Sequence, residues 1–479
     1  MQQKAARDLT GGAAGADRAS NRYVTLSFDE ALAMCQRYIT KAATNAFRRE
    51  NDPLKRREMT IGYINEFVDA RQSSAQGESR RFDVDGFEGL TELKSALADE
   101  ITHYGPITKA MEDPGVDEIR ANAYDQIFVE AEGRTLLLDK QFSDREHMER
   151  IISKLLAVSK VRMTPKTPMV NARTVEGYRV NATHADISPY NQPAFVIRKF
   201  SKKTITAEKL IEWQSFSQNM FRLMSLIPKA DLSWMTVGPT GGGKTTLNEL
   251  LIGEINSGAR IITIENPSEL RLLRRDARGR IQNDVLQYES VPDDDDASPA
   301  TMENLLINAM RQSPHWIGPG ELRTPGEFAT ALRAAQTGHY FFTTLHSEGD
   351  AKALLRFMTA YLMVANEPAE LALRNICNAV KFIIYNEKLA DGSRKVTSIS
   401  EVVGSDGLTP LVNQIYTFDF EDVEEDERTR EVKRIVGRHR RVGCISEETQ
   451  RRMLKSGIRR ARFEFLVNPP GPDEKEAYI

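Results

Sequence analysis

Hydrophobic residues recur at helical spacing over residues 28–72, within FDEALAMCQRYI and TIGYINEFVDA, and this spacing predicts helices near the N-terminus. The polar stretch QSSAQGESRR (72–81) interrupts the pattern and predicts a linker. From Gly86 onward, ELKSALADEITHY and DREHMERIISKLLAVS again have helical spacing, whereas QIFVEAEG, EGYRVNA and PAFVIRKF are typical of strands. This alternation predicts a small α+β domain.

A different pattern begins near residue 232, where short apolar runs alternate with helical segments. LSWMTV, ARIITIEN, GHYFFTTLHS and AVKFIIYNE predict buried strands, and TTLNELLIGEI and NLLINAMRQ predict helices. Such repeats predict a parallel sheet with helices on both faces. Beyond about residue 390, RKVTSISEVVG, NQIYTFDF and VKRIVGRHR predict strands, and SEETQRRMLKSGI predicts a final helix.

These patterns divide the chain into five parts. In chain order they are a disordered tail with a helical extension (1–85), an α+β N-terminal domain (86–201), a linker (202–215), a strand–helix core (216–390) and a C-terminal region (391–479). The small, polar residues of MQQKAARDLTGGAAGADRAS favour disorder in the tail. A chain of 479 residues, 40% of them hydrophobic, is long enough for two or three domains.

Composition bears on where the protein works. No apolar run approaches the ~20 residues of a membrane span, and the opening stretch lacks the apolar centre of a signal peptide. The three cysteines, Cys35, Cys377 and Cys444, are scattered and favour neither a disulfide framework nor a zinc site. We therefore expect a cytoplasmic protein.

The net charge of −3 and the pI near 6.3 argue against a dedicated nucleic-acid binder. Basic clusters occur in RRDARGR (274–280) and GRHRR (437–441), but the acidic runs DDDD (293–296) and EDVEEDE (421–427) balance them. Such clusters more often belong to solvated loops than to a site that binds a polyanion.

The strongest chemical signal is VGPTGGGKTTLNELL (237–251). Gly238, Gly243, Lys244 and Thr245 satisfy the phosphate-loop pattern G-x-x-x-x-G-K-[ST]. Glycines let the backbone amides turn toward phosphate oxygens, the lysine reaches the β- and γ-phosphates, and the threonine hydroxyl holds Mg²⁺. We expect a nucleoside triphosphate and Mg²⁺ as ligands, and the nucleotide to be bound by Gly238, Pro239, Thr240, Gly241, Gly242, Gly243, Lys244, Thr245 and Thr246.

Three later segments carry polar residues beside predicted strands. Glu265 follows ARIITI, and Glu321 follows WIGPG. A carboxylate at such a position can orient Mg²⁺ or activate water. His339 and His346 flank the apolar strand of QTGHYFFTTLHSE, where a histidine could contact the γ-phosphate. Each residue alone is more often structural, and it is their order along the chain that favours function.

That order resembles the secretion-ATPase superfamily, the hexameric motors of type II and type IV secretion and of type IV pili. In this family a Walker A loop is followed by an Asp box, a Walker B glutamate and a His box, and ENPSE, GPGELR and TGHYFFTTLHS occupy those places. Upstream, GPITKAMEDPGVDEIRANAYDQIFVE, TPMVNARTVEGYRVNA and FVIRKFSKKTIT are similar to the N-terminal domain of the CpaF-type ATPases of tight-adherence pili. LADGSRKVTSISEVVG and RIVGRHRRVGCISEETQRRMLKSGI resemble the tail of that branch, so the resemblance covers roughly residues 100–460.

The resemblance implies an α/β fold, with a RecA-like P-loop ATPase core and a parallel sheet preceded by the α+β domain and the helical extension. It implies a homo-hexamer that hydrolyses ATP at the cytoplasmic face of the inner membrane, beside a membrane platform protein, to drive pilus assembly, secretion or conjugation. Thr245, Glu265 and Glu321 would hold the metal, and Glu321 would position the attacking water. His339 and His346 would couple the γ-phosphate to the sheet, and Arg173, Arg179 and Arg198 would approach the nucleotide across the interdomain cleft or from a neighbouring subunit.

The sequence departs from the family pattern in the Asp box and in the Walker B strand. Asn266 stands where the family usually has Asp, and Gly318 and Pro319 interrupt the expected run of branched residues before Glu321. The four-cysteine zinc insert of some relatives is absent. The departures keep a second hypothesis open, a nucleotide-gated scaffold with little turnover. The P-loop and the basic clusters leave open a third hypothesis, that the protein is a DNA-translocating motor.

Overall fold

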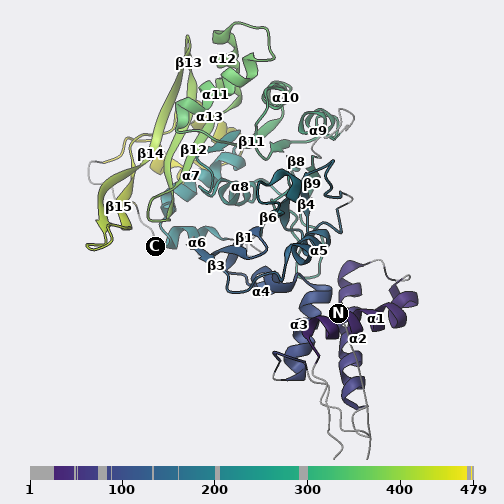
Figure 1. Ribbon diagram of the computed structural model, residues 1–479. Coiled ribbons are helices and arrows are strands. Elements are labelled where there is room, and N and C mark those ends of the chain that lie inside the picture. The colour runs from purple at the N-terminus through teal and green to yellow at the C-terminus, as the bar shows by residue number, and fades with distance from the viewer. Residues whose placement is uncertain are drawn as a thin grey trace, which may run out of the picture. The chain divides into compact units, whose positions relative to one another are not determined.

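The computed structural model describes residues 26–47, 50, 52–73, 84–87, 89–131, 134–159, 161–199, 205–290, 300–471 and 476. The predicted disordered tail, most of the predicted linker at 72–81 and the DDDD run lie outside the described residues. The chain forms two compact units, residues 1–202 (unit 1) and 203–479 (unit 2), and each is described by itself (Figure 1).

The first part of unit 1 is helical, as the apolar spacing predicts. Its helices are α1 (Phe28–Phe47), α2 (Pro53–Ser73) and α3 (Leu90–Thr102). They share one apolar core that includes Cys35, Phe67 and Leu97. The helix α3, which follows residue 85, thus packs with α1 and α2.

The second part of unit 1 is an antiparallel sheet with helices on one face. The strands are ordered β3-β2-β1-β6-β5-β4, and their apolar residues form one core with the helices. The residues that alternate with this core, such as Arg120 and Asn181, lie on the other face. The elements are α4 (Thr108–Glu112), β1 (Val116–Ala123), β2 (Gln126–Ala131), β3 (Arg134–Leu137), α5 (Arg145–Leu155), β4 (Met169–Arg173), β5 (Arg179–Thr183) and β6 (Ala194–Arg198), with 3-10 turns at Gly105–Ile107 and Ala185–Ile187. An α+β arrangement is confirmed.

Unit 2 is built on a nine-stranded mixed sheet ordered β15-β14-β13-β12-β7-β11-β10-β8-β9. The pairs from β12 to β9 are parallel, as predicted, whereas β12 to β15 form an antiparallel meander. The strands are β7 (Trp234–Val237), β8 (Arg260–Glu265), β9 (Asp284–Glu289), β10 (Trp316–Pro319), β11 (Tyr340–Leu345), β12 (Phe382–Lys388), β13 (Arg394–Asp406), β14 (Thr409–Glu425) and β15 (Val432–Arg441). The edge strand β9 lies between ARIITIEN and NLLINAMRQ, in a segment for which the sequence predicts no strand or helix.

Helices cover both faces of this sheet, as predicted (Figure 1). They are α6 (Ala207–Glu212), α7 (Gln218–Lys229), α8 (Lys244–Ile252), α9 (Met302–Ala309), α10 (Pro325–Gln336), α11 (Asp350–Leu362), α12 (Ala369–Ala379) and α13 (Glu447–Lys455), and 3-10 turns follow at Arg460–Arg462 and Glu464–Leu466. The faces separate because alternate strand residues point oppositely. Trp234 packs with α7 and α8, whereas the next residue, Met235, packs with α10 to α12.

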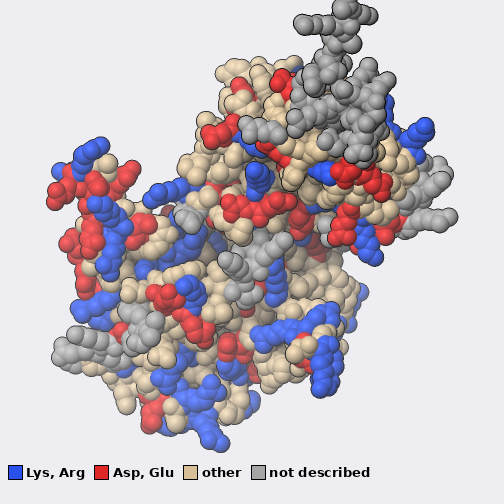
Figure 2. Space-filling view, turned by 90° about the horizontal axis from the view of Figure 1, so that it is seen from below, with Lys and Arg blue, Asp and Glu red and all other residues tan. Residues whose placement is uncertain are grey.

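The β14–β15 hairpin extends beyond the body of unit 2 (Figure 1). Side chains of both signs crowd its surface, at the left of Figure 2, and form cross-strand ion pairs such as Arg438–Glu421 at 2.9 Å. Among the described residues, no helix is long and apolar enough to cross a membrane.

The strand β10 tolerates the glycine and proline that depart from the family pattern. Its pairing with β8 runs through Pro319, whereas its pairing with β11 stops at Ile317. Gly320 donates its N–H to Ile264 of β8 at 2.8 Å, so the missing N–H of Pro319 faces β11. A Cβ on Gly318 would stand 2.1 Å from the Phe342 ring. The glycine therefore makes room for an aromatic ring that fills this part of the core.

Candidate nucleotide-binding site

The phosphate-loop sequence forms a cradle between the buried strand β7 and the helix α8. Gly238, Gly241 and Gly243 have φ values of +147°, +76° and +89°, which other residues rarely adopt. A Cβ on Gly238 would lie 1.9 Å from the carbonyl oxygen of Asn386, so the loop also needs glycine for close approach. The backbone here has the curvature that a phosphate cradle requires.

The first turn of α8 begins inside this cradle. Lys244 is the first residue of the helix, Thr245 is exposed and Thr246 is half-buried. Pro239 and Thr240 are exposed on the loop before it. The unpaired amides and dipole of a helix N-terminus favour an anion there. The loop conformation and the position of the helix N-terminus therefore suit the phosphates of a nucleoside triphosphate, as the lysine does.

Lys244 is buried and held by the loop that it closes. Its ammonium group donates to the carbonyl oxygens of Gly238 and Pro239, at 2.9 and 2.8 Å. Burial lowers the pKa of Lys244 to about 8, and the negative charge of Glu321 opposes that shift only in part. A phosphate group would supply the counter-charge that this buried ammonium otherwise lacks.

His346 joins this lysine to the Walker B carboxylate. Lys244 Nζ lies 3.3 Å from His346 Nδ1, and His346 Nε2 lies 2.9 Å from Glu321 Oε1. Burial, followed by the charge of Lys244, lowers the pKa of His346, which favours the neutral ring. A neutral ring that accepts from the lysine at Nδ1 donates from Nε2 to Glu321. The Walker A, Walker B and His-box motifs therefore meet in one hydrogen-bonded chain.

The second oxygen of Glu321 accepts two hydrogen bonds from the exposed Arg323, at 2.6 and 2.9 Å. Arg323 stands just before the capping box of α10, in which Glu327 accepts from the Arg323 and Thr324 amides. The carboxylate that the sequence predicts as the water-positioning group is thus oriented from both sides.

Glu265 lies at the end of β8, and its carboxylate oxygens point into the loop that follows the strand. One oxygen accepts from Ser268 Oγ at 2.9 Å, and the other accepts from the amides of Glu269 and Leu270 at 3.1 and 3.2 Å. Burial raises the pKa of Glu265, and these hydrogen bonds oppose the shift. Its Cγ packs so closely on Gly320 that a Cβ there would be 2.9 Å away. In this conformation Glu265 organises the Asp-box loop.

His339 and His346 do not lie together. His346 directly follows the last residue of β11, whereas His339 directly precedes the first. The six residues of the strand between them span about 20 Å, so the two histidines lie at opposite ends of β11. His339 Nδ1 lies 3.2 Å from both Thr337 Oγ1 and the carbonyl of Ala334, at the end of α10. Within one subunit, only His346 is at the edge of the sheet that carries the phosphate loop.

Two residues of the β12–β13 hairpin support the cradle and were not predicted. Arg394 Nε donates to the carbonyl of Gly241 at 2.9 Å. Asn386 is buried beneath the loop, and its Oδ1 has no hydrogen-bond partner. Arg394 lies in LADGSRKVTSISEVVG, which resembles the family tail, but the resemblance gave no role to Arg394 or to Asn386. Their proximity to the loop arises from the pairing of β12 with β7.

The predicted arginines form a row on the sheet of unit 1. Arg173 pairs with Arg179 across β4 and β5, Arg179 pairs with Arg198 across β5 and β6, and Arg198 pairs with Glu118. Paired residues share a face, which here is the one opposite the apolar core. Like charges directly opposite each other on a sheet are destabilising, so the row favours an anionic ligand. Its approach to the phosphate loop of unit 2 stays a prediction.

No group of three or more His, Cys, Asp or Glu side chains that could hold a metal alone occurs in the part of the chain that the structure describes. A P-loop metal is held mainly by the nucleotide phosphates and one hydroxyl, so the Thr245 hydroxyl and the Glu321 carboxylate, which His346 links to Lys244, have the chemistry to hold Mg²⁺ together with a bound nucleotide.

The model of a known family, described as "Type II/IV secretion system protein", matches residues 100–459. The conjugal transfer protein TrbB of Rhizobium radiobacter is 24% identical over 342 residues, 70% of this chain and 96% of that protein. A twitching motility protein of Neisseria gonorrhoeae is 28% identical over 243 residues, 50% of this chain and 59% of that protein. A crystal structure of the pilus retraction motor PilT with bound ADP covers 64% of this chain and 80% of that chain, with 22% identity and a TM-score of 0.46.

Three of the curated relatives match over only 33–59% of their own length, so the chain spans part of what those proteins contain. The family match, by contrast, extends over both units, from α3 to the residues that follow α13. It confirms the secretion-ATPase resemblance, while the CpaF-type branch stays a prediction. The chain belongs to the family of type II/IV secretion system proteins.

Proposed function

We propose that this chain is the subunit of a homo-hexameric ATP-hydrolysing motor that powers pilus assembly, secretion or conjugation at the cytoplasmic face of the inner membrane. The observation that carries the proposal is the chain Lys244–His346–Glu321, which joins a phosphate-binding cation to an oriented carboxylate. The relatives include a twitching motility protein and a conjugal transfer protein, and both names fit such a motor. Its partner would be an inner-membrane platform protein, and no dedicated nucleic-acid binding is expected.

Each loop residue has a role in binding. The amides of residues 238–246 would hold phosphate oxygens, and Lys244 would neutralise the β- and γ-phosphates. Thr245 and Glu321 would hold Mg²⁺, which when bound screens phosphate charge during transfer. When phosphate displaces the Lys244–His346 contact, His346 would turn toward the γ-phosphate and free one Glu321 oxygen to orient water.

Other residues would act on the nucleotide without belonging to the hydrogen-bonded series Lys244–His346–Glu321. Arg173, Arg179 and Arg198 would neutralise charge on the phosphates, across the interdomain cleft or from a neighbouring subunit, because guanidinium pairs bidentately with phosphate. Glu265 would reach the metal or water after leaving its loop partners. His339, at the far end of β11, would act only through the strand or on an adjacent subunit.

The scaffold hypothesis is favoured by one observation: both oxygens of Glu321 are engaged, by His346 and by Arg323, in the described state. A scaffold would keep these contacts with ATP bound, whereas a motor would exchange them. Turnover measurements separate the two.

The decisive experiment compares wild type with Glu321→Gln. The glutamine keeps the size and one acceptor but loses the charge, so ATP binding should persist while turnover falls at least about 10²-fold, as for a lost general base. Glu348→Gln, an exposed residue that pairs with Lys352, is the matched control and should hydrolyse normally. A fall of less than tenfold in an active wild type would remove Glu321 from the catalytic residues. A nearly inactive wild type that binds ATP would favour the scaffold, and turnover that rises with DNA would favour a DNA motor.

A further inference from the structure

Two arginine-rich segments, far apart in sequence, border one hollow of unit 2. The first is residues 271–283, between β8 and β9, and the second is residues 459–462, after α13. The hollow between them has a volume of about 720 Å³. Its lining includes Lys229, Glu254, Asn256, Arg274, Arg459 and Arg462. The fold thus brings the basic cluster of residues 274–280, for which the sequence favours a solvated loop, to the same hollow as a second group of arginines.

The first segment is a small hairpin with a fixed shape. Arg275 and Ile281 form an antiparallel bridge, and Gly279 has φ of +77° at the turn. Asp276 Oδ1 accepts from the amides of Arg278 and Arg280, both at 2.9 Å. This hairpin, hereafter the arginine hairpin (residues 274–282), presents its side chains from an ordered backbone.

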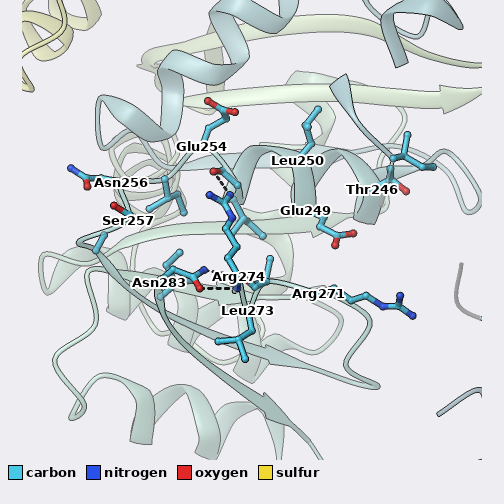
Figure 3. Close-up of a pocket in the computed structure, with 17 residues that line it drawn as sticks. Thr246, Glu249, Leu250, Glu254, Asn256, Ser257, Arg271, Leu273, Arg274 and Asn283 are labelled. Carbon is cyan, nitrogen blue, oxygen red and sulfur yellow. Dashed lines mark hydrogen bonds between the residues drawn. The ribbon is translucent and has the colours of Figure 1, made fainter. Parts of the chain in front are cut away.

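Arg274 fastens the arginine hairpin to α8. Its guanidinium donates to the carbonyl of Gly253, and its amide donates to Asn283 Oδ1 at 2.9 Å. Figure 3 shows Arg274 between Asn283 and the end of α8, in a second hollow of about 330 Å³ that runs from Thr246 to Ser257. The role of Arg274 is therefore structural. Within the arginine hairpin, Arg275 donates to the Gly279 carbonyl and Arg280 pairs with Asp276, which leaves Arg278 as the arginine best placed to meet a partner.

The charge of these segments is not balanced locally. Residues 271–283 contain five arginines and a single acidic residue, Asp276, in a chain whose net charge is −3. The exposed arginines Arg278, Arg459, Arg460 and Arg462 form no ion pair with the residues that the structure describes. The surface therefore complements an anionic partner.

Exposed aliphatic side chains accompany these arginines. Leu273 directly precedes the arginine hairpin and Ile281 lies within it, and they are 44% and 57% exposed. Leu454, near the second segment, is 48% exposed. Aliphatic groups that enter the headgroup region, beside guanidinium groups that pair with phosphates, are typical of a surface that lies on a bilayer. Single-stranded nucleic acid is bound instead with aromatic stacking. Residues 271–283 and 454–462 contain no aromatic residue, so a lipid surface fits better than nucleic acid.

The position of this surface leaves the nucleotide site accessible. The first residues of β8 and β9 are joined by the ion pair Arg260–Asp284 at 2.8 Å, and the arginine hairpin directly precedes Asp284. It thus lies at the edge where the parallel strands begin, whereas the phosphate loop follows the end of β7 at the opposite edge. Contact at one edge does not obstruct ATP at the other.

We propose that the arginine hairpin and residues 454–462 form a docking surface for anionic phospholipid, which holds the protein on the inner membrane. The proposal deepens the function proposed above and rests on it for the identity of the membrane. Phosphate headgroups would bind at Arg459 and Arg462, which line the hollow, and at Arg278 on the turn of the arginine hairpin, while Leu273 and Ile281 enter the headgroup layer.

Co-sedimentation with vesicles tests the proposal on the full chain. Wild type should bind vesicles of phosphatidylethanolamine and phosphatidylglycerol, should bind phosphatidylcholine vesicles weakly, and should be released by salt. Each arginine near such a surface contributes about fivefold in binding. Arg278→Glu/Arg459→Glu/Arg462→Glu should therefore weaken binding at least about 100-fold. Leu273→Ser/Ile281→Ser should weaken binding without changing its dependence on salt.

The matched control reverses three exposed arginines of the β14–β15 hairpin, Arg430, Arg434 and Arg438, and should bind as wild type does. The proposal would be overturned if the control and test variants lost vesicle binding equally, or if wild type did not bind the anionic vesicles. Tighter binding of duplex DNA than of anionic vesicles, lost in the same triple variant, would assign the surface to nucleic acid instead. ATP turnover of all variants is measured in parallel and should be unchanged. Normal turnover without vesicle binding refutes only the lipid surface, and vesicle binding without turnover refutes only the motor.

Discussion

The low pKa of Lys244 should make ATP affinity depend on pH between about pH 7 and pH 9. Burial lowers this pKa from 10.5 to about 8. Only the charged ammonium attracts phosphate, so deprotonation of the free protein competes with binding. Because the pKa of His346 is also lowered, below its ordinary 6.5, that ring stays neutral above pH 7 and adds no titration there.

The magnitude follows from the charged fraction of Lys244. With a pKa of about 8, that fraction falls from about nine tenths at pH 7 to about one tenth at pH 9, and the apparent Kd for ATP should rise about tenfold. An unshifted lysine at 10.5 would change the Kd by only about 3% over this range. Binding near pH 8 should also take up about half a proton, because bound phosphate restores the charge.

Isothermal titration calorimetry with a non-hydrolysable ATP analogue measures both quantities, the Kd at several pH values and the proton uptake in buffers of different ionisation enthalpy. Lys244→Arg is the control, because guanidinium stays charged throughout and its Kd should follow only the ionisation of the nucleotide. A wild-type Kd that changes less than twofold relative to this control would refute the buried, weakly basic lysine. Release of protons on binding, in place of the expected uptake, would refute it as well.

Two further predictions address the departures in β10 and the arginine row. Gly318→Ala places a Cβ 2.1 Å from the Phe342 ring and should destabilise the fold by about 1–3 kcal/mol, seen as a lower Tm; an unchanged Tm would mean that the ring has room to move. Arg179→Ala should lower ATP turnover at least about tenfold with little change in stability, by loss of charge neutralisation in the transition state. Arg120→Ala, on the same sheet face, should hydrolyse normally, and equal loss in both variants would show that the row acts only through the fold of unit 1.

Much of the fold is predictable because its signals are local. The helices of the extension, the strands and helices around the phosphate loop, and the C-terminal strands and helix all lie where apolar spacing predicts them. The strand β9 escapes prediction because DVLQYE lies on a sheet edge, where none of its side chains is fully buried, and so lacks a strong apolar pattern. The antiparallel direction of β13 to β15 depends on strand pairing, which spacing within one strand does not encode.

The sequence by itself determined the chemistry of the candidate site: a glycine-rich phosphate loop, a lysine, two glutamates and two histidines in a fixed order. Only the tertiary structure decided which of them meet. Strand order sets His346 between Lys244 and Glu321, since β11 lies beside β7 in the sheet, and the length of β11 carries His339 to the other edge. Strand pairing likewise aligns Arg173, Arg179 and Arg198 in a row and brings Asn386 beneath the loop. The physical reason is that residue type fixes what a side chain can bind, whereas proximity between distant residues is created by strand register and packing.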